Sequence, residues 1–140
     1  MIIDANVVLR AFFPDEAQAQ AQMVLRDHVA GRLRLAAPAL LPYELSNAVW
    51  HAERRGRISR IQADEILEAM VGLNIEIIPQ SWGVMLPIAR KFGCSGYDAA
   101  YLALAQLQDQ PLLTGDLHLF NAVHSQFDWV LWIENYPNQE

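Results

Sequence analysis

The sequence predicts an α/β fold in which a parallel sheet of five strands is covered by helices on both faces. Short apolar runs, suited to strands buried on both faces, alternate with longer segments that carry helical start and stop residues. Helices separate consecutive strands, which is the connection that parallel neighbours require. With 140 residues, 53% of them apolar, the chain can bury one substantial core, so we expect a single domain.

Five short apolar runs predict the strands. The first, MIID, is apolar up to Asp4, which places a charge at the edge of the core. Each run lies between helical or turn segments and has the length typical of a buried strand. The predicted strands span residues 1–4, 32–38, 74–79, 111–115 and 129–133.

Capping and breaking residues place the helices. Asp15 and Glu16 suit the positive end of the helix that they begin. Pro42 suits a first helical turn, and Ser59 suits an N-cap. Pro87 should kink its helix or restart it. The predicted helices span residues 5–13, 15–31, 41–56, 59–73, 81–93, 97–108 and 116–123.

Composition bears on where the protein works. No run of about 18 apolar residues predicts a transmembrane span, and the N-terminus lacks the basic segment and cleavage site of a signal peptide. Cys94 is the only cysteine, so no internal disulfide can form. We therefore expect a cytoplasmic protein without a membrane partner, with one domain at residues 1–134 and a polar tail at 135–140.

The net charge of −6 argues against a nucleic-acid binder that works through a broad basic surface. This net charge does not exclude an enzyme that binds phosphate through a metal ion. Four arginines fall within seven positions, at Arg54, Arg55, Arg57 and Arg60. They suit either a solvated helix end or a phosphate-contacting patch at the rim of a site.

Four acids fall where predicted elements meet. Asp4 ends the first strand, and Glu44 lies at the start of the helix after the second strand. Asp98 opens an apolar helix, and Asp116 directly follows the fourth strand. Parallel strands end at one edge of the sheet, where sites form, so three of these acids should meet there. Asp98 joins them only if its helix begins at that edge, which spacing alone does not decide.

Each acid also has a purely structural interpretation. Asp98 and Asp116 suit N-caps, and Glu44 suits the helix dipole. Asp4 is harder to explain in this way, because a carboxylate beside a core strand needs a partner. Four clustered carboxylates repel one another unless a cation lies between them, and oxygen ligands suit Mg²⁺ or Mn²⁺ better than zinc.

These residues also carry a family resemblance. The segments MIIDANVVLRAFF, PYELSNAVW, SGYDAAYLALAQ and PLLTGDLHLF resemble, in order, the acidic motifs of PIN domains, and most closely those of the VapC group of toxin ribonucleases. The resemblance implies a three-layer sandwich with a five-stranded parallel sheet. It also implies Mg²⁺- or Mn²⁺-dependent cleavage of RNA, a cognate VapB-like antitoxin and a homodimer.

The motifs also transfer residue by residue. The catalytic, metal-binding carboxylates would be Asp4, Glu44, Asp98 and Asp116, with Asn6 and Thr114 as supporting polar residues. Many PIN domains carry a further acid shortly after the last of these. Residues 117–119 are Leu, His and Leu here, so one or two metal ions remain possible. His118 suits either a proton shuttle or a plain surface histidine.

Other functions remain as alternatives. A PIN nuclease in RNA processing that is not a toxin would carry the same acids, and a non-catalytic PIN-fold binding module would not need all four. A phosphoacceptor receiver domain would require a late lysine, and no lysine follows Lys91. The helices at 41–56 and 59–73 carry apolar residues that suit either the core or a groove for an antitoxin helix. These are Leu45, Val49, Trp50, Ile61, Ile66 and Met70.

Overall fold

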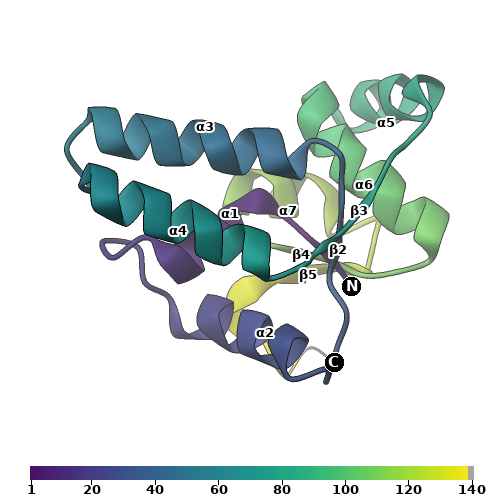
Figure 1. Cartoon of the computed structure of the whole chain (residues 1–140). Coiled ribbons are helices and arrows are strands. Elements are labelled where there is room, and N and C mark those ends of the chain that lie inside the picture. Colours follow the sequence, from purple (N-terminus) through teal and green to yellow (C-terminus); the bar gives the residue numbers. More distant parts are fainter. Residues whose placement is uncertain (139–140) are drawn as a thin grey trace.

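A computed structural model, which describes residues 1–138, contains one sheet of five parallel strands flanked by helices (Figure 1). The strand order is β3-β2-β1-β4-β5, so β1 lies at the centre. The fold prediction is confirmed. The strands are β1 (Ile2–Ile3), β2 (Ala36–Pro38), β3 (Glu76–Ile78), β4 (Leu112–Thr114) and β5 (Val130–Trp132).

In the described part of the chain, seven α-helices and one short 3-10 turn connect the strands, and a second 3-10 turn follows β5. Helix α6 crosses the centre of the sheet, packing against β1, β2 and β4, and its residues 99–105 are all buried. The helices are α1 (Ala5–Phe12), α2 (Ala19–Val29), α3 (Leu41–Arg54), α4 (Arg60–Gly72), α5 (Met85–Phe92), α6 (Gly96–Gln108) and α7 (Leu117–Val123). The turns are η1 (Trp82–Val84) and η2 (Ile133–Asn135).

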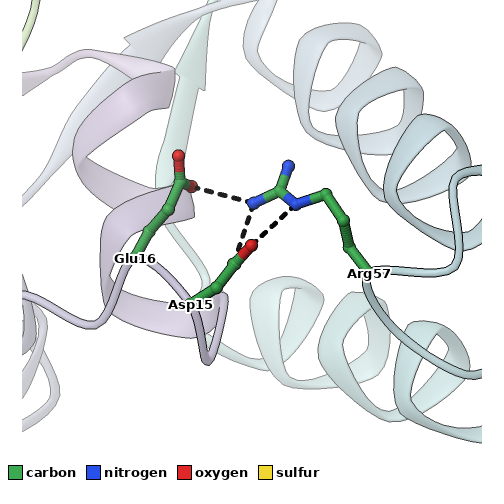
Figure 2. Close-up of polar contacts among 3 residues, drawn as sticks. All are labelled: Asp15, Glu16 and Arg57. Carbon is green, nitrogen blue, oxygen red and sulfur yellow. Dashed lines mark hydrogen bonds and ion pairs between the residues drawn. The ribbon is translucent and has the colours of Figure 1, made fainter.

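Helix α2 begins later than its acidic residues predict. Its first residue is Ala19, so Asp15 and Glu16 lie in the connection from α1 rather than at its positive end. The two acids instead pair with Arg57, whose Nε and Nη2 each lie 2.8 Å from an Asp15 oxygen (Figure 2). Glu16 Oε2 lies 3.6 Å from Arg57 Nη2. An ion pair between distant segments has replaced the local helix-dipole interaction.

Two other helix starts follow from ordinary backbone chemistry. Ser59 caps α4 as predicted: its Oγ accepts from the Gln62 N–H at 3.1 Å, and Gln62 Oε1 accepts from the Ser59 N–H at 2.8 Å. Pro87 lies in the first turn of α5, directly after η1. A first-turn N–H has no partner within its own helix, so proline costs little there.

The segment that follows β5 packs against the rest of the domain at Tyr136. The Tyr136 hydroxyl donates to the Asp27 carboxylate on α2, and Tyr136 packs against the core. Residues 139 and 140 of the predicted tail lie outside the described residues, and the boundary at residue 134 stays a prediction. Between residues 1 and 138, no helix is both long and apolar enough to cross a bilayer.

Candidate active site

The candidate site lies where the order of the strands reverses. From β1 the chain builds outward through β2 and β3, then returns to the other side of β1 for β4 and β5. In open parallel sheets, a crevice forms beyond the carboxyl ends of the two strands at such a point. Asp4 directly follows β1, and residues 114–116 end β4 and enter α7, so both segments meet at this crevice.

All four predicted acids line one cavity of about 280 Å³ at this edge. Helix α6 therefore begins at the same edge as the strand ends, which brings Asp98 to the other three acids. Asn6, a predicted supporting residue, also lines the cavity, whereas Thr114 lies buried behind it. The lining residues are Asp4, Ala5, Asn6, Leu9, Glu44, Asn47, Ala48, Asp98 and Asp116.

A chain of hydrogen bonds holds Asp4. Its backbone N–H continues the sheet by donating to the Leu113 carbonyl at 3.0 Å. Thr114 Oγ1 donates to Asp4 Oδ2 at 2.8 Å and accepts from the Asp116 N–H at 3.0 Å. Asn6 Nδ2 donates to the same Oδ2 at 3.0 Å. Among the described residues, every hydrogen bond to this carboxylate falls on Oδ2, so Oδ1 remains available to a ligand.

A second set of contacts holds the loop between β4 and α7. Asn6 and Arg10 lie one turn apart on α1 and bind the two polar groups of the Gly115 backbone. The Gly115 N–H donates to Asn6 Oδ1 at 2.8 Å, and Arg10 Nη2 donates to the Gly115 carbonyl at 2.7 Å. A Cβ on residue 115 would lie 2.9 Å from Arg10 Nη1 and 3.2 Å from Asn6 Oδ1, so glycine permits this close approach.

Glu44 is oriented by a buried tyrosine. The Tyr101 hydroxyl donates to Glu44 Oε1 at 2.6 Å, from the interior of α6. The sequence places Tyr101 in an apolar helix, and neither Tyr101 nor Asn47 is among the site residues that the motifs predict. A local signal was present for both, because Asp98 and Tyr101, like Glu44 and Asn47, are spaced three residues apart on one helix face.

The two N-cap interpretations have different outcomes. Asp116 does cap α7, since its Oδ1 accepts from the Leu119 N–H at 3.2 Å. The interpretation of Asp98 as an N-cap is wrong: Ser95 caps α6, and its Oγ accepts from the Asp98 N–H at 3.0 Å. The Asp98 carboxylate therefore lies in the cavity without a capping role.

Burial and mutual repulsion disfavour the charged forms of these acids. Burial raises the pKa of Asp4 to about 7, Thr114 opposes that shift, and the other three acids add to it. Burial also raises the pKa of Glu44, against the hydrogen bond from Tyr101. The pKa of Asp98 is raised by burial and then by Asp116.

The donor set fits a hard divalent cation in its chemistry. Four carboxylates surround the cavity, and the ion pairs found between residues 1 and 138 include none of them. Within the same residues, no three acidic, histidine or cysteine side chains are already placed to share one ion. The acids thus line the cavity rather than converge on one point, and oxygen ligands of this kind suit Mg²⁺ or Mn²⁺.

Comparison with known proteins agrees with this arrangement. The family model for the PIN domain matches residues 1–124. The chain belongs to the PIN domain family. It is 30% identical over 123 residues to Ribonuclease VapC3 of Pyrobaculum aerophilum, a match that covers 85% of this chain and 91% of that protein. The family resemblance seen in the motifs is thereby confirmed.

A solved structure confirms the fold of this PIN domain. The crystal structure of PAE2754 from Pyrobaculum aerophilum superposes with a TM-score of 0.74 and is 22% identical in sequence. The likeness covers 96% of this chain and 83% of the other. It shows that the PIN-like α/β sandwich extends over nearly the whole chain.

Proposed function

We propose that this PIN domain is a Mg²⁺- or Mn²⁺-dependent endoribonuclease that acts as a VapC-like toxin and is inhibited by a cognate antitoxin. The observation that carries the proposal is the set of four acids around one cavity, with Asp4 buried and in no ion pair among the described residues. The similarity of the chain to a protein named Ribonuclease VapC3 supports RNA as the substrate.

The acids at positions 4, 44, 98 and 116 would hold the metal. When bound, a divalent ion supplies a water of lowered pKa and stabilises negative charge on the phosphate under attack. Thr114 and Asn6 fix Asp4 Oδ2 and leave Oδ1 for that role, while Tyr101 fixes Glu44.

The Thr114 hydroxyl also couples two of the acids. It contacts the Asp4 carboxylate and the Asp116 backbone at once, so the strand ends hold both residues in one relative position. Preorganised ligands of this kind do not have to be ordered when substrate binds.

Cleavage assays test the proposal directly. Purified protein free of antitoxin should cleave structured RNA with Mg²⁺ or Mn²⁺ and stop in excess EDTA. Asp4→Asn, Asp98→Asn and Asp116→Asn should each lower the rate on the order of 100-fold, because a lost ligand misplaces the metal. Glu68→Gln, on the exposed surface of α4, is the matched control. Cleavage that persists in EDTA would refute the metal mechanism.

The antitoxin surface that we propose is a groove between α3 and α4 beside the edge strand β3. It has a volume of about 290 Å³ and is lined by ten residues. An apolar helix face of the antitoxin suits this groove. A homodimer is proposed on the family resemblance. The lining residues are Leu41, Pro42, Leu45, Ser46, Leu67, Met70, Val71, Asn74, Ile75 and Ile77.

The six apolar residues predicted for such a groove divide between core and surface. Leu45, Val49 and Met70 are buried, whereas Trp50 and Ile61 are exposed. Ile66 lies between these extremes. Of the six, Leu45 and Met70 line the groove, so its exposed apolar wall comes mainly from other residues.

A further inference from the structure

A second cavity, of about 530 Å³, adjoins the acidic one. Asn6 and Asp116 line both cavities, so the two cavities lie side by side. The walls of the second cavity differ in charge from those of the first, because they include Arg10 and His118 as well as Trp132 and Glu134. A polymer that lies across the acidic cavity and continues past Asp116 would enter this second cavity.

Arg10 carries a positive charge that no acid neutralises within the described residues. The ion pairs between residues 1 and 138 do not include it, and its side chain makes one hydrogen bond, to the Gly115 carbonyl. A guanidinium has five N–H donors, so most of them remain for a ligand. Their planar fork matches the oxygens of a phosphate group.

Binding of RNA to this acidic protein requires a local positive charge that attracts the phosphate backbone. The chain has a net charge of −6, and the four acids of the neighbouring cavity repel phosphate. The arginine cluster does not lie beside them. Arg57 is paired with Asp15 and Glu16. Arg54 lies at the other end of α3 from Glu44, ten residues and about 15 Å along the helix axis.

We propose that Arg10 binds a backbone phosphate of the RNA next to the one at the acidic cavity, with the second cavity as the channel for that part of the strand. This proposal rests on the proposed function, since it assumes RNA as the substrate. Arg10 is then a positioning residue with two contacts: it holds the Gly115 carbonyl with one donor and the RNA with others.

The salt dependence of RNA binding tests this assignment. The probe is a fluorescein-labelled, mixed-sequence, single-stranded RNA, titrated in EDTA at several NaCl concentrations so that binding is measured without cleavage. Each phosphate contact contributes about 0.7 to the slope of log affinity against log salt. Arg10→Gln should therefore reduce the slope by about 0.7 and weaken binding at low salt by about tenfold.

Two matched variants separate this effect from general loss of charge and from loss of the Gly115 contact. Arg26→Gln removes one positive charge on α2 at an exposed arginine whose side-chain partner is Gln22, and it should leave the slope unchanged. Arg10→Lys keeps the charge and should keep the slope. An unchanged slope in Arg10→Gln, an equal fall in Arg26→Gln, or no RNA binding by the wild type would each overturn the assignment.

Kinetics distinguish this proposal from the proposed function. If the protein cleaves RNA with Mg²⁺ or Mn²⁺, Arg10→Gln should raise KM more than it lowers kcat. A fall in kcat with KM unchanged would make Arg10 only a support for the loop at Gly115 and would refute phosphate binding. Absence of cleavage by the wild type refutes the nuclease, while the salt slope still reports on Arg10.

Discussion

Thr114 and Asp4 are joined by a buried hydrogen bond of 2.8 Å between strand ends that are 110 residues apart in the sequence. The threonine hydroxyl has one hydrogen, which it donates to Asp4, and it accepts the N–H of Asp116 on a lone pair. One side chain thus links the carboxylate after β1 to the backbone after β4. The position of Asp4 and that of Asp116 depend on each other through this hydroxyl.

Replacing Thr114 by valine should damage both stability and activity. Valine keeps the shape but removes one of the two hydrogen bonds to the Asp4 carboxylate, so only that from Asn6 remains, and it leaves the Asp116 N–H without its acceptor. We expect a cost of about 1–3 kcal/mol in the free energy of unfolding. We expect cleavage to fall at least tenfold. Thr114→Ser keeps the hydroxyl and is the control. Urea unfolding and cleavage rates that are the same in both variants would contradict this role.

The positions of Asp4, Thr114 and Asp116 could be predicted because their geometry is set locally. Each lies at or directly after an apolar strand, and parallel strands bring their carboxyl ends to one edge. Spacing alone does not place Asp98 at this edge, since the start of its helix is set by how α6 packs across the sheet. The structure settles its placement through the contacts of α6 with β1, β2 and β4.

Contacts between distant segments explain what could not be predicted. Asp15 lies before the start of α2 and pairs with Arg57, which is 42 positions away in the sequence. The Tyr101 hydroxyl donates a hydrogen bond to Glu44, which lies 57 positions away in the sequence. Arg10 donates to the carbonyl of Gly115, which lies 105 positions away. No helical or strand period encodes these pairings. The spacing of Asp98 and Tyr101 places both on one face of α6, but it does not identify Glu44 as the partner of Tyr101.

The stability of the metal-free protein should fall as the pH rises from about 4 to about 7. The unfolded Asp4 has a pKa of 3.8, and burial raises its folded pKa to about 7. Within that window the folded state holds a proton that the unfolded state has lost, so increasing pH favours unfolding. Each pKa unit corresponds to about 1.4 kcal/mol, which makes the loss on the order of a few kcal/mol.

Urea unfolding in EDTA across this range provides the measurement. Asp4→Asn has no proton to lose, so its stability curve should be flatter, and the variant should exceed the wild type above pH 7. Saturating Mg²⁺ should reduce the loss in the wild type, because the ion stabilises the ionised carboxylates. Parallel pH curves for wild type and variant in EDTA would contradict the raised pKa.

Asp98→Asn should stabilise the metal-free protein by about 0.5–2 kcal/mol, the usual gain when strain at a functional site is relieved. The variant removes a charge next to Asp116 while keeping the shape of the side chain. The gain should shrink or reverse in saturating Mg²⁺, because the wild type then gains binding energy that the variant lacks.

Ser95→Ala serves as the control for Asp98. It removes the N-cap of α6 and should cost about 1 kcal/mol with or without Mg²⁺. Thermal melts of the variants in EDTA and in Mg²⁺ separate the two effects. An Asp98→Asn protein as stable as the wild type under both conditions would remove Asp98 from the proposed metal site.

The groove between α3 and α4 gives the last prediction, which concerns the antitoxin. Val71 lines this groove and is 71% exposed, so Val71→Asp should leave the domain folded while placing a charge against an apolar antitoxin helix. We expect affinity to fall at least 100-fold, because the charge would be buried without a partner. Leu107→Asp on α6, at 61% exposure and outside the groove, is the matched control. Calorimetric titration with the proposed cognate antitoxin provides the measurement, and cleavage by both variants checks that the nuclease site is intact. Equal affinity in the wild type and Val71→Asp would place the antitoxin on another surface.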